Sequence, residues 1–197
     1  ETTAALTHLL REELGTLREI EEAQVLTFLL GLLRRLCQTG AFYDQQLESY
    51  VKDRGNAFLL SRERYLPGYG PRNPPPAALT LNHVSQYFET LFSKQSGWYL
   101  GWFNKCLAID QPLATSEYEQ AYRLTLQILE KDGWLIRLDA GQDEAWMLQP
   151  QRWSMTTRLA EMACGGCGHR QMVAAEQFQY WQSSPCLRHG CAGHYQS

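Results

Sequence analysis

The chain has 197 residues, of which 44% are hydrophobic and 12% aromatic, and its formal net charge is -3. This composition supports a buried core and excludes disorder over the whole chain. The near-neutral charge disfavours a free-standing nucleic-acid-binding domain, which is usually basic, although residues 61–80 and 151–197 each carry two more basic than acidic residues.

The first predicted region, residues 1–65, is helical. Within residues 3–38, leucines recur at helical spacing, and Gly40 provides a stop for the second helix. A further short helix is expected over 45–52 and a short strand over 57–60. No apolar run reaches the roughly 18 residues that can cross a bilayer, so the sequence predicts a cytoplasmic protein without a membrane segment.

Residues 66–76 contain five prolines and two glycines. Proline restricts φ and lacks an amide donor, so this composition favours an extended linker over a helix or a strand. We therefore expect a linker over residues 66–80 that separates the helical region from the next domain. Tyr69 and Arg72 could contact a partner, but a solvated loop is the commoner case.

Residues 81–150 follow the plan of a winged-helix domain, a helix-turn-helix variant in which three helices precede a two-stranded wing. Ser116 and Glu119 have the spacing of a capping box at the start of the third helix, and Gly133 follows its end. A polar turn then separates two apolar runs, as in a β-hairpin. The predicted elements are helices over 83–94, 98–107 and 116–132 and strands over 134–138 and 145–148.

The third predicted helix of this domain has an acidic polar face. Winged helices often bind DNA through that helix, but here acidic residues outnumber basic ones: Glu117, Glu119 and Glu130 against Arg123 and Lys131. Because negative side chains repel phosphates, we expect the domain to pack against another domain rather than to bind a DNA groove. The aromatic residues at helical spacing within 98–103 are expected in the core.

Two cysteine pairs near the end of the chain predict a metal site within residues 151–197. Each pair is closely spaced, eighteen residues separate the pairs, and glycines adjoin both. This pattern is typical of a zinc ion held by four thiolates on two tight turns, in a zinc ribbon or knuckle. Four protein ligands leave no open position, so the expected role of zinc is structural. The predicted ligands are Cys164, Cys167, Cys186 and Cys191.

Three other uses of these cysteines stay open. Two disulfides would need an oxidising compartment, but the sequence shows no secretory signal and leaves Cys37 and Cys106 without a neighbouring cysteine. A redox pair normally opens a helix after a strand in a βαβ unit, and no such pattern surrounds Cys164. A nearby histidine could also replace one cysteine as a metal ligand; the histidines in question are His169, His189 and His194.

No catalytic motif accompanies the predicted metal site. The sequence lacks a phosphate-binding loop, a dinucleotide-binding glycine motif, a His-Glu-x-x-His pair and the zinc-deaminase signature. We therefore assign no catalytic residue and do not expect this segment to be an enzyme by itself. Because the sequence starts without methionine and stops soon after Cys191, we expect it to be a piece of a larger protein.

Three stretches of the sequence are similar to a known family. The first contains Thr-Gly-Ala-Phe at 39–42 and Gly-Asn-Ala-Phe at 55–58, and the second is Leu-Pro-Gly-Tyr-Gly-Pro at 66–71. The third is the cysteine pattern itself, with Trp181 and Pro-Cys-Leu-Arg at 185–188. Together they resemble the accessory region that follows the motor core in large superfamily 2 DNA helicases of the MrfA/YprA type and in related bacterial anti-phage defence helicases.

The resemblance implies an accessory DNA-binding and scaffolding region of an ATP-dependent DNA helicase or translocase that acts in bacterial genome defence or repair. The ATPase motifs would lie outside this chain, and its partners would be DNA, the motor domains of the same protein or other defence-complex subunits. Sequence-independent phosphate contacts are then expected from four arginines, namely Arg152, Arg158, Arg170 and Arg188. Two alternatives stay open: a zinc-stabilised protein-interaction module without DNA contact, and a nuclease whose histidines bind a metal.

Overall fold

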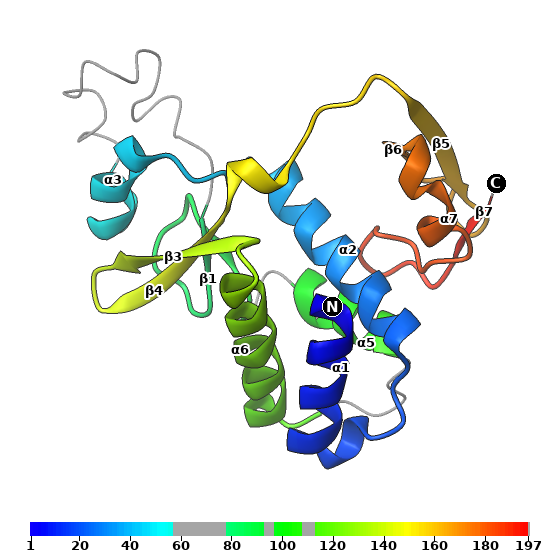
Figure 1. Ribbon diagram of the computed structural model, residues 1–197, viewed down its shortest axis with the longest axis horizontal. Coiled ribbons are helices and arrows are strands. Elements are labelled where there is room, and N and C mark those ends of the chain that lie inside the picture. Colours follow the sequence, from blue (N-terminus) through cyan, green and yellow to red (C-terminus); the bar gives the residue numbers. More distant parts are fainter. Residues whose placement is uncertain (57–77, 93–96, 108–112, 197) are drawn as a thin grey trace. The chain divides into compact units, whose positions relative to one another are not determined.

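The computed structural model describes residues 1–56, 78–92, 97–107 and 113–196 (Figure 1). Within these residues helices exceed strands, and the strands form two small sheets. The chain is therefore mixed α and β, and the prediction of helices with a smaller β part is confirmed at this level. The strand predicted over 57–60 and the proline-rich stretch over 66–76 lie outside the described residues.

Two compact units make up the structure, and each is assembled from separate stretches of sequence. The first unit comprises Glu1–Leu32, Gly97–Leu124 and Ser154–Ser197, and the second comprises Leu33–Ser96 and Thr125–Trp153. The division falls inside two long helices, α2 (Glu22–Gln38) and α6 (Thr115–Lys131), so each helix contributes to both units. The contiguous segments expected from the sequence, 1–65, 81–150 and 151–197, therefore do not coincide with these units.

Aromatic side chains fill the helical core of the first unit. This unit holds α1 (Thr2–Glu13), the 3-10 helix η1 (Gly15–Leu17), α5 (Trp98–Leu107) and the adjoining parts of α2 and α6. Phe28 of α2 meets Phe103 of α5 edge-on, with ring centroids 5.3 Å apart. The hydroxyl of Tyr122 on α6 donates to the carbonyl of Tyr99 at 2.6 Å. The core placement predicted for the aromatic residues of α5 is confirmed, with Trp98 alone half-buried.

Helices α2 and α5 approach each other closely at Gly31. The indole N–H of Trp102 donates to the carbonyl of Phe28 at 3.0 Å, and a Cβ atom at position 31 would overlap the same indole ring. Glycine weakens a helix by roughly 0.5–1 kcal/mol relative to alanine. Its position in the middle of α2 is explained by this contact, because no larger residue leaves room for the tryptophan.

A four-stranded sheet and α3 form the core of the second unit. The strands are β1 (Leu79–Thr80), β2 (Glu89–Thr90), β3 (Leu135–Ala140) and β4 (Asp143–Leu148), in the order β2-β1-β4-β3. β1 is parallel to β2 and antiparallel to β4, and it occupies the last residues of the predicted linker. Tyr50 and Val51 of α3 (Glu48–Lys52), which follows the 3-10 helix η2 (Gln45–Leu47), are fully buried against Met147 and its neighbours.

The elements predicted between residues 98 and 148 are largely confirmed. Helix α5 has the predicted bounds, and the hairpin of β3 and β4 follows α6 as expected. The start of α6 differs, since the helix begins before Ser116 and the carboxylate of Glu117 accepts the N–H of Ala114 at 2.9 Å. Glu119, expected in the capping box, pairs instead with Arg123 one turn further on, at 2.7 Å. The capping box was therefore predicted at the wrong residues.

The helix predicted over 83–94 is wrong. The residues before β2 form turns, and the hydroxyl of Ser85 accepts the N–H of Tyr87 at 3.3 Å. Such local side-chain bonds compete with helix formation. Glu89 is then held in β2 by pairing with β1 and by an ion pair with Arg35 of α2 at 3.2 Å. Arg35 is distant in sequence and the pairing with β1 spans ten residues, so neither contact is visible in the helical spacing of the apolar residues that misled the prediction.

The second sheet belongs to the first unit and has three antiparallel strands. They are β5 (Leu159–Cys164), β6 (Arg170–Ala174) and β7 (Tyr195–Gln196), in the order β6-β5-β7. Met162 of β5 and Val173 of β6 point to the same buried face, each 1% exposed. The 3-10 helix η4 (Ala175–Gln177) and the short helix α7 (Phe178–Trp181) follow β6 and bury the indole of Trp181.

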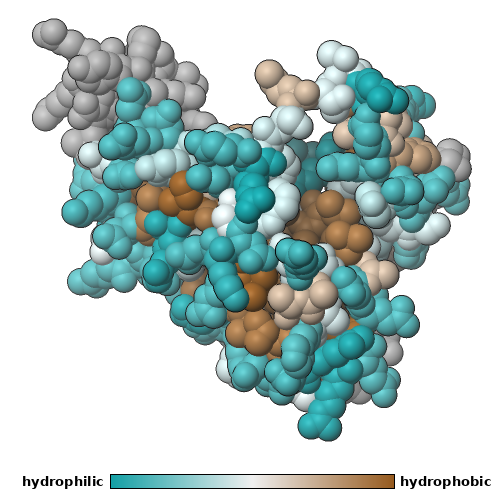
Figure 2. All heavy atoms as spheres, viewed as in Figure 1, coloured by the Kyte–Doolittle hydropathy of each residue, from teal (hydrophilic) through white to brown (hydrophobic). Residues whose placement is uncertain are grey.

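The surface is mainly hydrophilic on the face drawn in Figure 2, where hydrophobic side chains show in smaller areas. Among the described residues, the large hydrophobic side chains that stay exposed all lie between positions 155 and 180, and they are Met155, Leu159, Met172 and Tyr180. None of the helices in the described ranges is long and apolar enough to cross a membrane.

Candidate metal centre

The four cysteines predicted as ligands are brought together in the first unit. Their Sγ atoms all lie within 4.8 Å of one another, although the residues span positions 164 to 191. The Sγ atoms of Cys164 and Cys191 are 3.7 Å apart, and those of Cys167 and Cys186 are 3.8 Å apart. A disulfide bond is about 2.05 Å long, so these are free thiol groups. The cluster can hold one metal ion.

The first cysteine pair lies where β5 turns back into β6. Cys164 is the last residue of β5, and its N–H donates to the carbonyl of His169 at 2.9 Å. The N–H of Gly168 donates to the carbonyl of Cys164 at 2.8 Å and closes the turn that carries Cys167. The hairpin therefore fixes the separation of the first two sulfur atoms without help from the rest of the chain.

Every sulfur of the cluster accepts a backbone hydrogen bond from the residue two positions further on. The donors to Cys164, Cys186 and Cys191 lie 3.3–3.4 Å from sulfur, and Cys167 accepts a backbone bond as well. The donor residues are, in chain order, Gly166, His169, Arg188 and Gly193. Hydrogen bonds to the charged form stabilise a thiolate, so the backbone of both loops is arranged for ionised sulfur.

Burial acts against ionisation at three of the cysteines, Cys167, Cys186 and Cys191. At Cys191 the N–H of Gly193 lowers the pKa, but the neighbouring thiols and burial leave it raised. The backbone N–H of His169 lowers the pKa of Cys167 to about 7. Burial raises the pKa of Cys186 to about 12, in spite of the N–H from Arg188. A buried thiolate is costly unless a cation lies beside it, and a bound metal ion would supply that charge. The donor set therefore fits a metal ion better than four independent thiols.

The two cysteine loops meet at glycine residues. A Cβ atom at Gly193 would lie 2.7 Å from Sγ of Cys164 and 2.9 Å from Cα of Gly166. Neither distance is compatible with a side chain at that position, and the obstruction is partly backbone. The two loops can therefore bring four sulfur atoms to one point only because both have glycine at the place of contact.

The nearby histidines have other contacts. His169 Nδ1 lies 2.8 Å from the hydroxyl of Tyr195. The ring of His189 lies above the start of α5, where Cβ atoms at Gly97 and Gly101 would come within 2.9 and 3.5 Å of it. The metal-ligand group found among the described residues contains cysteines only. The geometry therefore does not place a histidine among the four candidate ligands.

Helix α5 holds the second cysteine loop by three consecutive carbonyl groups. The indole N–H of Trp98 donates to the carbonyl of Leu187 at 2.7 Å. The ammonium group of Lys105 donates to the carbonyls of Cys186 and Arg188, at 3.0 and 2.9 Å. Sequence reasoning missed Trp98 and Lys105, because more than 80 residues separate them from the loop and no local pattern marks them.

The four arginines predicted to contact phosphate are not gathered in one place. Arg152, in the 3-10 helix η3 (Pro150–Arg152), belongs to the second unit, where it donates to the carbonyl of Asp132 and covers the ring of Trp134. The other three lie in the first unit. Arg158 pairs with Glu176 at 3.2 Å and Arg170 with Glu161 at 2.9 Å, whereas Arg188 is exposed and forms no ion pair with a described residue.

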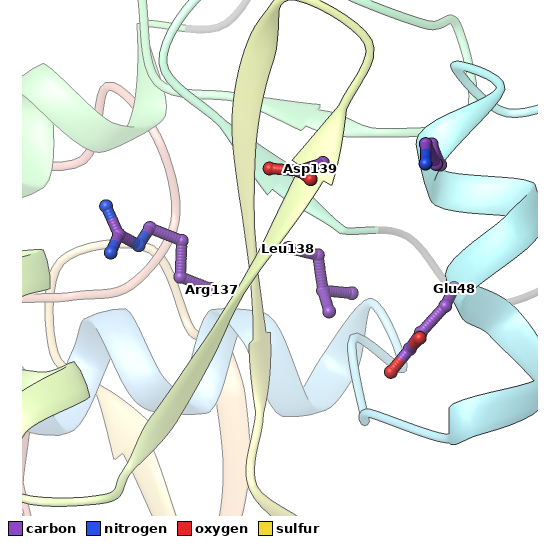
Figure 3. A pocket seen from close by; sticks show the side chains of 5 residues that line it. Glu48, Arg137, Leu138 and Asp139 are labelled. Atoms are coloured by element: carbon purple, nitrogen blue, oxygen red, sulfur yellow. The ribbon is translucent and has the colours of Figure 1, made fainter.

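A separate pocket of about 280 Å³ lies in the second unit (Figure 3). Its lining residues are Glu48 and Lys52 of α3 and Arg137, Leu138 and Asp139 of β3. In Figure 3, Arg137 and Leu138 leave β3 on opposite sides, and Arg137 pairs with two carboxylates outside this lining. The lining has two acidic and two basic side chains and contains no cysteine or histidine, so it offers no thiol or imidazole group.

No protein-family model matches the sequence, and no curated protein or solved structure matches it significantly. The site must therefore be interpreted from its own geometry. That geometry defines a four-cysteine cluster that could hold a metal ion, in which all the donors are sulfur and the second loop is fastened to a core helix.

Proposed function

We propose that the chain is a zinc-stabilised scaffolding region, accessory to a large ATP-dependent DNA helicase or translocase of bacterial genome defence or repair. The observation that supports the scaffolding role is the four-cysteine cluster bonded to α5, because it joins a metal loop to a helical core. The helicase context is supported by the sequence resemblance and is a prediction on that ground.

Zinc is the proposed metal because of the donors and their spacing. Four sulfur atoms placed about 2.3 Å from a central zinc ion in a tetrahedron lie roughly 3.8 Å apart. The Sγ pairs at 3.7 and 3.8 Å agree with that separation. Thiolates also suit iron, so metal analysis of the purified chain decides the identity. All four positions would be filled by protein, which makes the zinc structural.

Two finer fold assignments accompany the proposal. A zinc ribbon or knuckle is supported by the β5–β6 hairpin that carries the first cysteine pair. A winged-helix fold is supported by the chain order of α5, α6, β3 and β4, and by β1 as a further strand antiparallel to β4. Its first helix would then have to come from the chain before β1, since 83–92 is not helical.

DNA contact, if it is made by the tail, is proposed to depend on Arg188. This side chain is exposed beside the second cysteine loop and is not engaged by a carboxylate of the described residues. An ion pair between Arg188 and a DNA phosphate could therefore form without breaking an ion pair among the described residues. Arg158 and Arg170 would first have to leave their carboxylate partners, and Arg152 its helix carbonyl.

The second candidate is a protein-interaction module without DNA contact. It is favoured by the engagement of three of the four arginines and by the acidic face of α6. Fewer free cations mean fewer released counterions and therefore weaker binding to any nucleic acid. The two candidates differ in a single measurable property, the salt-dependent affinity for DNA.

The test is a fluorescence-anisotropy titration of forked and single-stranded DNA with the zinc-loaded chain at several salt concentrations. We expect binding that weakens with salt, and we expect Arg188→Ala to flatten the slope of log K against log[salt] by roughly 0.7–0.9. Arg158→Ala, which removes an ion-paired arginine of the same unit, is the matched control and should change the slope less. No binding at low salt would establish the interaction module instead.

A further inference from the structure

We propose that Tyr195 is a positioning residue of the metal centre, whose hydroxyl group joins the two cysteine loops through Leu187 and His169 beside the Sγ atom of Cys186. This inference rests on the proposed structural metal, and it adds a residue that the sequence pattern does not indicate. Tyr195 lies four residues beyond the last cysteine and is 1% exposed. It lies in β7, whereas His169 and Cys186, whose side chains it contacts, lie in the two cysteine loops.

The backbone of Tyr195 already connects the two loops. In β7 it pairs with Cys164, the first ligand. Its N–H donates to the carbonyl of Ser184 at 3.0 Å, and its carbonyl accepts the N–H of Ser183 at 3.1 Å, directly before the second loop. The phenol ring is therefore held from both sides, and the position of its hydroxyl group is fixed by main-chain bonds rather than by the metal.

The hydroxyl group has three polar neighbours, and they come from both loops. The N–H of Leu187 donates to it at 3.3 Å. His169 Nδ1 lies 2.8 Å away, and Sγ of Cys186 lies 4.0 Å away. His169 follows the first cysteine pair, while Cys186 and Leu187 belong to the second. One oxygen atom therefore bridges the loops beside the sulfur cluster.

The distances show which of these contacts are hydrogen bonds. A phenol has one proton to donate and can accept two hydrogen bonds. Its oxygen accepts the N–H of Leu187 at 3.3 Å. The phenol and His169 Nδ1, 2.8 Å apart, share a second hydrogen bond, in which the tautomer of the imidazole decides the donor. Sγ of Cys186, at 4.0 Å, lies beside this bridge.

The role follows from what a ligand needs from its neighbours. Hydrogen bonds from outside the ligand set orient the donor atoms and tune their charge, and losing one typically lowers metal affinity 10–100-fold. Cys186 is the most buried sulfur of the cluster, so it has the fewest alternative donors from solvent. The N–H of Arg188 donates to this sulfur, and the hydroxyl of Tyr195 holds the neighbouring backbone through the N–H of Leu187.

The test compares Tyr195→Phe with Tyr180→Phe. The first keeps the buried ring and removes the hydroxyl, whereas the second removes the hydroxyl of an exposed tyrosine in the same part of the chain. We expect Tyr195→Phe to bind one zinc ion and to lose it to a chelator about 10-fold faster than wild type, with Tyr180→Phe unchanged. In the cadmium-loaded chain, the 113Cd resonance should shift in Tyr195→Phe only, because a purely structural loss leaves the bound ion's sulfur environment as it was.

A second pair of variants tests the same bridge from the other side. His169→Asn keeps an N–H donor near the position of Nδ1, and His169→Leu does not. We expect the asparagine variant to retain zinc nearly as wild type and the leucine variant to release it about as fast as Tyr195→Phe. If Tyr195→Phe does not fold, this pair of His169 variants still tests whether the bridge between the two cysteine loops retains the zinc ion.

Three outcomes overturn the inference, and they are distinct. Wild-type release rates and an unshifted 113Cd resonance in Tyr195→Phe would remove the role of the hydroxyl while leaving the zinc site intact. Equal release from the asparagine and leucine variants of His169 would remove the role of the hydrogen bond between His169 and Tyr195. A wild-type chain that binds no metal would instead refute the proposed zinc centre, and the inference with it.

Discussion

Replacing Lys105 by methionine should loosen the second cysteine loop from α5. Methionine keeps most of the aliphatic stem and removes the ammonium group, so the two bonds to the carbonyls of Cys186 and Arg188 are lost. The bond to Leu187 from Trp98 remains. The variant therefore isolates the contribution of one charged donor to the joint between the metal loop and the helix.

The size of the effect can be worked out from the two bonds. A hydrogen bond that involves a charged group contributes about 1.5–3 kcal/mol. One of the bonds is partly buried at 3.0 Å, and the other is exposed at 2.9 Å, where water replaces the lost donor. Counting the pair as little more than one such bond gives a loss of about 2 kcal/mol in the free energy of unfolding, or roughly 30-fold in the unfolding equilibrium.

The measurement is urea unfolding of the zinc-loaded chain, followed by tryptophan fluorescence and by zinc release. Lys131→Met is the control, because Lys131 is exposed in the last turn of α6, within the second unit. Its loss removes a helix-dipole interaction of about 0.3–1 kcal/mol. Unfolding midpoints of Lys105→Met and Lys131→Met that coincide, with equal zinc release, would refute the idea that α5 anchors the metal loop.

Three further perturbations have defined outcomes. Gly193→Ala should weaken zinc binding and destabilise the first unit, since its Cβ would meet Sγ of Cys164; wild-type zinc content after dialysis against a chelator would contradict this. Zinc affinity should fall as the pH is lowered, because the pKa of Cys186 is raised to about 12 and metal binding must displace its proton; calorimetric heats that do not depend on the ionisation enthalpy of the buffer would oppose it. Gly31→Ala should lower the free energy of unfolding by about 1–3 kcal/mol, because the added methyl group overpacks the site of Trp102. A thermal midpoint equal to wild type would show that α2 and α5 can move apart.

Local signals in the sequence were sufficient to predict the four-cysteine cluster and the helices and strands from α5 to β4. Two cysteines on each tight turn determine their own geometry, so close spacing predicts a cluster before the turns are placed. The hairpin of β3 and β4 has a polar turn between two apolar strands. Leu135, at the start of β3, pairs with Leu148, at the end of β4, as expected when the chain folds back at this turn. In the hairpin the contacting residues are near neighbours in sequence, and in the cluster the close spacing within each cysteine pair is the local signal.

Non-local contacts explain what the sequence did not predict. Residues 83–92 have apolar residues at helical spacing but are held by β1 and by Arg35, so tertiary pairing overrides the local pattern. The supports of the metal centre have the same character. Lys105 and Tyr195 carry no motif, and each becomes informative only when the chain has brought it beside the second cysteine loop.

The candidate metal centre and the helical core of the first unit share one helix, and this bears on what a bound ion would stabilise. Trp98, Trp102 and Lys105 lie along one face of α5. Trp98 and Lys105 bond to the second cysteine loop, and Trp102, stacked on Trp98, bonds to α2. The carbonyl of Tyr99 accepts a bond from Tyr122 of α6. A cysteine module on a flexible tether would fold or unfold alone and leave the helices unchanged. The binding free energy of the proposed zinc ion would instead reach the helices through these shared contacts, so we expect the ion to stabilise the whole unit and not the tail by itself.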